Sequence, residues 1–380
     1  MPSAKQLFRY LTTPVNTTTI NDNASNTLSQ TQPTLDLITK LSLRSMERKI
    51  LVAVDEGEES KYALSWCLKN VVNQNFMDTI VLLYVKPPQV VYTAVDGTGY
   101  LFSTDIIATI DKYKNEVAET VIEKAKKLCK DLQNVKVEAK VEAGDPRDVI
   151  CEAAEKMAVD MVVLGSHGYG LIKRAFLGSV SNHCAQNIKR PVLIVKKPKN
   201  HSANSTPTPD LVICKSKKSL KSMATKERKI LVAVDEGEES KYALSWCLKN
   251  IVTEDGMDTI VLLYVKPPQA VYTALDGTGY LFSPDVIATI DKYRNDVAET
   301  VIETAKKLCR DHPKVKVETR VDMGDPRDVV CEVAEKMAVD MVVLGSHGYG
   351  LIKRAFLGSV SNHCAQNIKH PVLIVKKPKT

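Results

Sequence analysis

The chain repeats itself once, at the length of a whole domain. Residues 47–199 align with residues 227–379 at a constant offset of 180 positions and without a gap. The copies differ at 23 of the 153 aligned positions, so 130 of 153 positions, about 85%, are identical. Each copy is as long as an ordinary single domain, so the repeat predicts two complete tandem domains and not a solenoid of small units.

Two polar segments lie outside the copies. Residues 1–46 and 200–226 are rich in Ser, Thr, Asn and Pro and carry too few apolar residues to build a core. We expect a disordered leader at 1–46, a first domain at 47–199, a basic Ser/Thr/Pro-containing linker at 200–226, and a second domain at 227–380. An organelle transit peptide within the leader is the alternative, because that segment contains few acids.

The net charge of +7 lies mostly in those two segments. Residues 1–46 contribute +2 and residues 200–226 contribute +4, which leaves +1 for the two domains together. Nearly neutral domains give no electrostatic reason to expect nucleic-acid binding. No apolar run approaches the roughly 20 residues of a membrane span. We expect a cytoplasmic protein, with nuclear presence and organelle targeting as open alternatives.

The cysteines predict neither a zinc site nor a thioredoxin-like site. The chain has nine cysteines, an odd number, and no CxxC motif. Four of them (Cys67, Cys129, Cys151 and Cys184) recur 180 residues later. We interpret them as reduced and mostly buried small side chains in a reducing compartment.

Each copy alternates apolar strands with amphipathic helices. The first strand, "KILVAVD", ends at Asp55, and a later helix begins at "DPRD", where Asp145 is placed as its cap and Pro146 as its first residue. The five strands of the first copy are predicted at 49–55, 79–85, 135–144, 161–165 and 191–197. This order predicts a parallel sheet with helices on both faces. Ligands of such sheets bind beyond the carboxyl ends of the strands, where the strand order reverses.

The loop after the fourth strand is rich in glycine, hydroxyl and basic residues. It reads "GSHGYGLIKRAFLGSVS" from Gly165 to Ser181 and recurs unchanged in the second copy. The glycines permit positive φ and close backbone approach, and Ser179 begins a helix whose free N–H groups attract an anion. The hydroxyls of Ser179 and Ser181 are candidate donors, and Lys173 and Arg174 are candidates for a terminal phosphate.

Other nucleotide motifs and catalytic sites fit the sequence less well. The loop lacks the Lys-Ser/Thr of a P-loop and the first-strand context of a GxGxxG fingerprint. His167 has no nucleophile or second acid at the spacing of a triad, and His167 with His183 is a poor metal signature. We therefore predict no catalytic residue and no protein-bound metal.

These features together resemble the universal stress protein family. The resemblance is carried by "ILVAVDEGEES", "VLLYVKPP", the "GDP" loop, the Gly-x2-Gly-x9-Gly-Ser loop and "PVLIVK", in both copies. The loop spacing is similar to that of the ATP-binding branch, and "KPP" and "SHGYGLIKRA" are similar to plant members. The resemblance implies two Rossmann-like domains of the adenine nucleotide alpha hydrolase type, each with a five-stranded parallel sheet of order 3-2-1-4-5.

The resemblance also implies that both domains bind ATP or AMP, with Mg²⁺ accompanying ATP. In the first domain the implied nucleotide-binding residues are Ala53, Val54, Asp55, Val85, Gly165, Ser166, His167, Gly168, Gly178, Ser179, Val180 and Ser181. In the second domain they are Ala233, Val234, Asp235, Val265, Gly345, Ser346, His347, Gly348, Gly358, Ser359, Val360 and Ser361. Asp55 would lie near the ribose or a metal-bridged phosphate, and the Val85 backbone near the adenine edge.

The fifth strand implies an assembly. An apolar edge strand must be covered, and in the resembling family it pairs with its counterpart in a second domain. We expect the two domains of one chain to form this pseudo-dimer, with exchange between chains to a higher homo-oligomer left open. The function implied is that of a nucleotide-binding regulator of the stress response. A slow ATP hydrolase and a nucleotide-independent chaperone or scaffold are the alternatives.

Overall fold

A computed structural model describes most of both copies. It covers residues 47–72, 77–88, 104–132, 135–166, 177–198, 227–253, 257–268, 284–346 and 357–378. The predictions for the leader, the linker and the loop interiors (His167, Gly168, Lys173, Arg174, His347 and Gly348) lie outside these residues.

The first domain follows the predicted alternation of strands and helices. In chain order its elements are β1 (Lys49–Ala53), α3 (Glu58–Asn70), β2 (Thr79–Lys86), α4 (Thr104–Cys129), β3 (Lys136–Ala143), α5 (Pro146–Lys156), β4 (Met161–Gly165), α6 (Ser179–Asn187) and β5 (Val192–Val195). The predicted helix start before α5 is confirmed, because the Asp145 side chain accepts a hydrogen bond from the Arg147 N–H at 2.9 Å and Pro146 is the first helical residue. Asp55 follows the end of β1.

The second domain repeats this order. Its elements are β6 (Lys229–Ala233), α7 (Glu238–Asn250), β7 (Thr259–Lys266), α8 (Pro284–Cys309), β8 (Lys316–Met323), α9 (Pro326–Lys336), β9 (Met341–Gly345), α10 (Ser359–Asn367) and β10 (Val372–Val375). Within each domain all strand pairs are parallel, and the order 3-2-1-4-5 is confirmed. No helix in the described part of the chain is both long and apolar enough to cross a membrane.

Helices cover both faces of the sheet, as predicted. Buried side chains of α3, α4, α7 and α8 form one core cluster, and those of α5, α6, α9 and α10 form the other. β1 and β4 are buried almost throughout because helices cover both of their faces. β3 alternates exposed and half-buried residues because it is an outer strand of the sheet.

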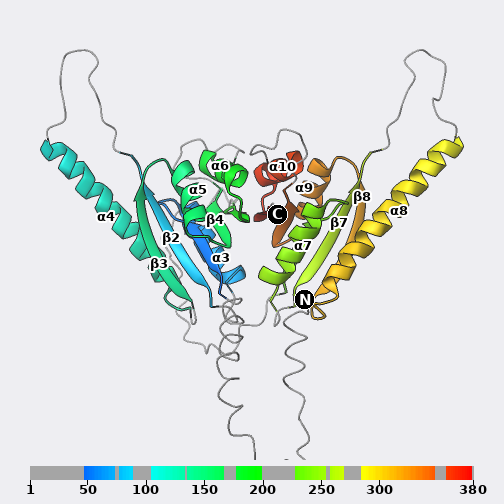
Figure 1. Cartoon of the computed structure of the whole chain (residues 1–380), viewed down its shortest axis with the longest axis horizontal. Coiled ribbons are helices and arrows are strands. Elements are labelled where there is room, and N and C mark those ends of the chain that lie inside the picture. Colours follow the sequence, from blue (N-terminus) through cyan, green and yellow to red (C-terminus); the bar gives the residue numbers. More distant parts are fainter. Residues whose placement is uncertain are drawn as a thin grey trace, which may run out of the picture.

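Part of the apolar face of α4 lies outside the core. The apolar pattern places Ile110, Tyr113 and Leu128 on the buried face of α4, but they are 42%, 67% and 45% exposed. The helix has 26 residues, about 39 Å, whereas an eight-residue strand spans only about 26 Å. The outer end of α4 therefore extends beyond the sheet that it covers, as Figure 1 shows. Leu128 is at the other end, where Ala125 and Cys129 are buried, and helix length does not explain its exposure.

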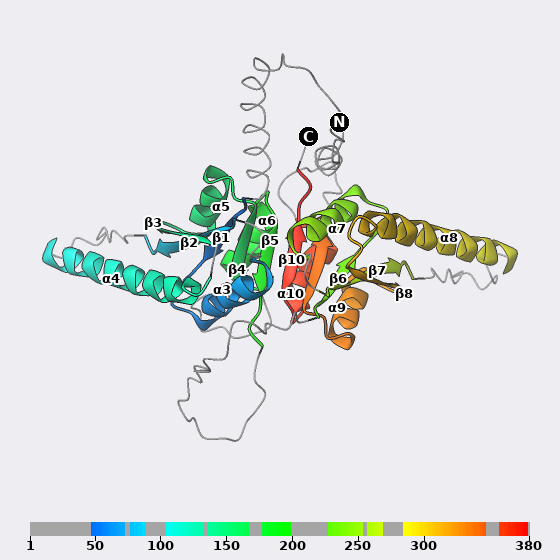
Figure 2. The same ribbon diagram turned by 90° about the horizontal axis from the view of Figure 1, so that it is seen from below.

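The two domains form one ten-stranded sheet (Figures 1 and 2). β5 and β10 pair antiparallel, with Leu193 opposite Leu373, and lie side by side in the centre of Figure 2. The Arg48 guanidinium, held by Asp78 at 2.7 and 2.8 Å, also donates to the Asn250 carbonyl of the second domain. Arg228 makes the equivalent bond to the Asn70 carbonyl.

Candidate functional site

The site predicted from the sequence lies where the strand order reverses. β1 pairs with β2 on one side and with β4 on the other, with Val52 opposite Val163. The chain leaves β1 into α3 on one face of the sheet and leaves β4 toward α6 on the opposite face. The carboxyl ends of β1 and β4 thus open into one crevice, which is the position that ligands occupy in this kind of sheet.

The two helices that begin at this crevice differ in charge. α3 has two acids in its first turn, Glu58 and Glu59, which already satisfy its positive end. α6 has no acid in its first turn and no side-chain hydrogen bond at its N-cap, Gly178. The first N–H groups of α6, together with the exposed Ser179 hydroxyl, can therefore receive an anion.

Hydrogen bonds hold the two ends of the glycine-rich loop together. The Gly178 N–H donates to the Ser166 carbonyl at 2.8 Å, and the Ser181 hydroxyl donates to the same carbonyl at 3.1 Å. In the second domain the Ser361 hydroxyl donates to the Gly345 carbonyl instead, at 3.1 Å. The prediction that the Ser181 hydroxyl is a phosphate donor needs correction, because that hydroxyl is buried and closes the loop.

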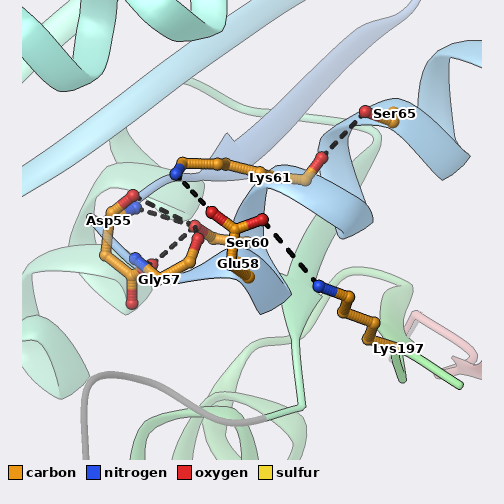
Figure 3. A network of polar contacts seen from close by, with 7 residues as sticks. All are labelled: Asp55, Gly57, Glu58, Ser60, Lys61, Ser65 and Lys197. Carbon is orange, nitrogen blue, oxygen red and sulfur yellow. Dashed lines mark hydrogen bonds and ion pairs between the residues drawn. The ribbon is translucent and has the colours of Figure 1, made fainter. Parts of the chain in front are cut away.

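Asp55 shapes the turn between β1 and α3 (Figure 3). Its Oδ1 accepts hydrogen bonds from the Gly57 N–H at 2.8 Å and from the Ser60 hydroxyl at 2.5 Å. In the second domain Asp235 makes the same two contacts with Gly237 and Ser240. One oxygen of the carboxylate, Oδ1, therefore stabilises the turn. A ligand that contacts Asp55 has to use the other oxygen, Oδ2.

Ion pairs surround this turn. Lys61 donates to Glu58 at 2.6 Å, which lowers the pKa of that carboxyl, and Lys197 lies 3.8 Å from the same side chain (Figure 3). Glu59 accepts from the Lys197 N–H at 3.0 Å and from the Ser166 hydroxyl at 3.4 Å. Glu59 therefore links α3 to the residues that follow β4 and β5.

Gly165 permits a close contact between α3 and β4. A Cβ on Gly165 would lie 3.0 Å from the Glu59 carbonyl carbon and 3.1 Å from the Ser60 nitrogen, which are backbone atoms. On Gly345 the corresponding distances would all be 2.8 Å. The requirement for glycine here is steric and comes from the fold.

Three half-buried apolar residues border the crevice on the face of α5 and α6. Ala53, Val85 and Val180 pack against the same core cluster, and Ala233, Val265 and Val360 do so in the second domain. β2 continues to Lys86, although β1 ends at Ala53 opposite Leu83. Val85 follows Leu83 by two residues, and alternate residues turn their backbone groups to the same neighbour, so the Val85 backbone faces the end of β1.

The structure brings most of the predicted residues to this crevice. Those that lie there are Ala53, Asp55, Val85, Gly165, Ser166, Gly178, Ser179, Val180 and Ser181, with their equivalents in the second domain. Val54 and Val234 also follow the ends of β1 and β6, but their side chains are buried on the opposite face, in the core of α3, α4, α7 and α8. His167, Gly168, His347 and Gly348 are outside the described residues. Sequence reasoning missed Ser60 and Glu59, although the Asp-x4-Ser spacing across a strand-to-helix turn is a signal for such a cap.

A cavity of about 280 Å³ lies elsewhere, between α3 and α4. Leu64, Tyr113, Val117, Thr120 and Lys124 contribute to its lining, and Asp55 and Glu56 lie at one end. It is on the α3 and α4 face of the sheet, whereas the N-terminus of α6 and the residues Ala53 and Val85 are on the other face. This cavity therefore lies on the opposite face of the sheet from the crevice and adjoins it at Val54 and Asp55.

Comparison with known proteins identifies the family. The model of the universal stress protein family matches residues 46–196 and again residues 227–376, which is most of the chain. The chain belongs to the universal stress protein family. A universal stress protein of Mycolicibacterium smegmatis is 25% identical over 334 residues, covering 87% of this chain and 97% of that protein.

One solved structure of this family agrees with the fold over most of the chain. A universal stress protein of Archaeoglobus fulgidus is 22% identical, covers 87% of this chain and 98% of its own, and superposes with a TM-score of 0.50. A family member of Arabidopsis thaliana, solved with AMP bound, is 24% identical and covers 40% of this chain and 92% of its own, with a TM-score of 0.30. The AMP is a property of that protein, and a likeness of this strength does not carry it to the present chain.

Proposed function

We propose that each domain of this universal stress protein binds an adenine nucleotide, ATP or AMP, at the crevice between β1 and β4. The observation that carries the proposal is the N-terminus of α6, which has neither a first-turn acid nor a capping side chain and lies at the reversal of strand order. Ser179, Val180 and Ser181 would hold phosphates through their backbone N–H groups, with the Ser179 hydroxyl as a further donor. The same arrangement recurs at Ser359 in the second domain.

The nucleoside would lie on the apolar side of the same crevice. Ala53, Val85 and Val180 offer half-buried apolar surface, and the Val85 backbone offers a donor and an acceptor to the adenine edge. Asp55 would contact the ribose or a metal-bridged phosphate through Oδ2. Ser166 and the loop residues His167 and Gly168 remain predictions as ligand contacts.

Mg²⁺ would enter with the nucleotide. No cluster of three or more metal-ligating side chains is present in the described part of the chain. Mg²⁺ commonly binds through one carboxylate together with substrate phosphates and water. Asp55 and Asp235 are the carboxylates that fit this role, so tight Mg²⁺ binding is expected only with ATP.

The proposed role is regulation by nucleotide occupancy. A bound nucleotide would change the surface that the domain offers to a protein partner beside the N-terminus of α6. We propose that the chain acts in the cytoplasm as the intrachain pseudo-dimer formed through β5 and β10. The alternatives to this role are slow ATP hydrolysis and nucleotide-independent scaffolding. The following experiment distinguishes among the three.

The test adds one acid to the first turn of α6. In Ser179→Asp and Ser359→Asp the new carboxylate stabilises the positive end of the helix, but it repels a phosphate placed there. We expect calorimetry of the full chain to show two sites for ATP and AMP, and each substitution to weaken binding at its own site by tenfold or more (about 1.4 kcal/mol) without lowering thermal stability. Titrations with and without Mg²⁺ test whether the metal binds together with ATP.

Asn187→Asp provides the matched control. It adds the same charge at the other end of α6 and should leave nucleotide affinity nearly unchanged. Unaltered binding in the double variant Ser179→Asp/Ser359→Asp would overturn the proposed site, and no binding by the wild-type chain at millimolar nucleotide would leave the scaffold hypothesis. ATP turnover that disappears in the double variant would establish the hydrolase alternative.

A further inference from the structure

The cavity between α3 and α4 shares only Val54 and Asp55 with the proposed nucleotide site. It measures about 280 Å³, just below the range of about 300–1,000 Å³ that is usual for pockets that bind small molecules. Its walls come from two helices that lie side by side on one face of the first domain's sheet (Figure 2). A space of this size suits one small organic molecule rather than a segment of a partner protein.

α4 contributes both an apolar wall and a polar rim to the cavity. Val117 and Val121 are four residues apart and so lie on one face of the helix, and with Leu64 of α3 they form part of the wall. Thr120 and Lys124 also line the cavity, are four residues apart on an adjacent face, and are exposed. A ligand that fits this pattern has an apolar body and a polar head.

The carboxylates at the cavity already have partners. Asp55 is held through Oδ1 in the turn before α3 (Figure 3). Glu56 accepts a hydrogen bond from the Tyr84 hydroxyl at 2.7 Å, and Glu116 lies 4.0 Å from Lys112. A cationic head group would have to compete with these contacts.

The two lysines at the cavity differ in this respect. Lys61 donates to Glu58 at 2.6 Å (Figure 3). In the part of the chain that the structure describes, Lys124 forms no hydrogen bond or ion pair, and it acts on Glu58 only through longer-range electrostatics. The charged group that remains available at the rim is therefore a cation, and it is complementary to an anionic head group.

The second domain lacks this arrangement. Thr304 stands at the position of Lys124 and donates to the Thr300 carbonyl of its own helix at 2.8 Å. Leu128, which lines the cavity, is exposed, whereas its equivalent Leu308 is half-buried and packs against the core. The second domain therefore has neither the cation nor the exposed apolar side chain at these positions.

We propose that the cavity of the first domain is a binding site for a small amphipathic carboxylate, such as a medium-chain fatty acid. Lys124 binds the carboxylate at the rim, and the apolar chain lies between α3 and α4 against Leu64, Val117 and Val121. From Lys124 to Val117 the helix rises about 10 Å, which is comparable to the extended chain of such an acid. Binding at this cavity does not require a nucleotide in the crevice.

Calorimetry of the full-length chain with octanoate tests the proposal. We expect one site per chain, with 1-octanol binding about three- to fivefold more weakly because it lacks the charge that pairs with an exposed lysine. Octylammonium should bind more weakly still, and each CH₂ removed from the acid should weaken binding about two- to fourfold. No binding at millimolar octanoate, or octylammonium bound as tightly as octanoate, would overturn the proposal.

Three substitutions on α4 locate the site. Lys124→Thr gives the first domain the side chain of the second and should weaken octanoate binding about three- to fivefold. Lys127→Thr makes the same charge change at an exposed residue outside the cavity and should bind as the wild type does. Thr120→Phe places a ring in the cavity and should weaken binding by tenfold or more.

The outcomes of these substitutions separate a specific role from a structural one. Thr120 and Lys124 are exposed, so we expect thermal stability to change little in all three variants. Equal octanoate affinities of Lys124→Thr and Lys127→Thr would overturn the role of Lys124. Unaltered binding in Thr120→Phe would overturn the cavity as the site.

A photoreactive octanoate that carries a diazirine distinguishes this cavity from the nucleotide crevice. Trypsin gives "NEVAETVIEK" from α4 but "NDVAETVIETAK" from α8, so mass spectrometry separates the two copies. We expect the label in the α4 peptide, with labelling unchanged in Ser179→Asp, the variant that tests the nucleotide site. Equal labelling of the α8 peptide, or labelling that Ser179→Asp removes, would overturn the proposal without bearing on nucleotide binding.

Discussion

Gly165 and Gly178 stand at the two ends of one loop for different physical reasons. Neither is required for a left-handed backbone, since Gly178 has φ −57° and Gly165 is not among the described residues with positive φ. Gly165 leaves room for the backbone of α3. Gly178 places no side chain at the beginning of α6, which leaves the helix N–H groups accessible.

This difference makes a prediction about stability. Gly165→Ala would force a Cβ to within 3.0 Å of the Glu59 backbone, so we expect it to lower the free energy of unfolding by about 1–3 kcal/mol. Gly345→Ala should lower the free energy of unfolding further, because its Cβ would lie only 2.8 Å from backbone atoms of Glu239 and Ser240. Urea unfolding of both variants is the measurement, with the N-cap variant Gly178→Ala as a control that should lose about 1 kcal/mol or less. A variant Gly165→Ala of native stability would show that the helix moves aside.

At the scale of one element, α5 shows how sequence determines a helix start. Asp145 accepts the Arg147 N–H, and its carboxylate also binds the Arg147 side chain at 2.5 Å. These bonds lower the pKa of Asp145 to about 2. The preceding Gly144 has φ 149°, and Gly324 has the same conformation before α9, so this turn requires glycine in both domains.

The cap of α5 can be tested directly. Asp145→Ala leaves the Arg147 N–H without its side-chain acceptor, and we expect a loss of about 1 kcal/mol in the free energy of unfolding at pH 7. Asp145→Asn keeps an acceptor and should lose less. Folding lowers the pKa of Asp145, so the stabilisation that depends on its negative charge is fully present above the pKa that this carboxyl has in the unfolded chain. That stabilisation disappears as pH falls toward 2. Chemical denaturation at pH 7 and pH 3 measures both parts.

At the scale of the whole molecule, the two domains share one buried junction. β5 and β10 pair antiparallel, and Arg48, Arg228, Lys196 and Lys376 each donate to a carbonyl of the opposite domain. All four carbonyls lie at or near the C-terminal ends of helices, where a positive charge is favoured. The junction is nearly symmetric because both copies supply the same groups.

The lysines of this junction predict a pH dependence. Burial lowers the pKa of Lys196 and Lys376 to about 8, below the value of 10.5 for an exposed lysine. Between about pH 8 and pH 10.5 the unfolded chain binds more protons than the folded one, so these lysines should make the free energy of unfolding rise with pH across that window. The expected size is about 3 kcal/mol for each lysine over the whole window.

Denaturation between pH 7.5 and 9.5 tests this dependence. The stability of the wild type should rise relative to that of Lys196→Met/Lys376→Met as pH increases. Lys197→Met, which changes an exposed neighbouring lysine, is the control and should run parallel to the wild type. A constant difference between wild type and double variant would show that the two lysines do not titrate in this range.

The sequence by itself determined the repeat, the strand and helix order, the parallel sheet and the position of the crevice. Each of these follows from local periodicity and from short segments such as "KILVAVD" and "GDPRD", whose preferences agree with the final fold. It also placed the carboxyl ends of β1 and β4 beside each other, because few topologies satisfy the rules for parallel strands. The proposed nucleotide residues at this crevice were thus accessible to sequence reasoning.

Only the tertiary structure decided what individual groups do there. It assigned the Ser181 hydroxyl to loop closure, Asp55 Oδ1 to a turn, and Gly165 to the contact with α3, because each role depends on atoms distant in the chain. It exposed Ile110 and Tyr113, since helix length relative to the sheet is not a local property. It also brought Lys376 from the other domain to the Gln186 carbonyl near the end of α6. Hydrophobic patterning specifies faces, whereas contacts between faces form only when the elements pack.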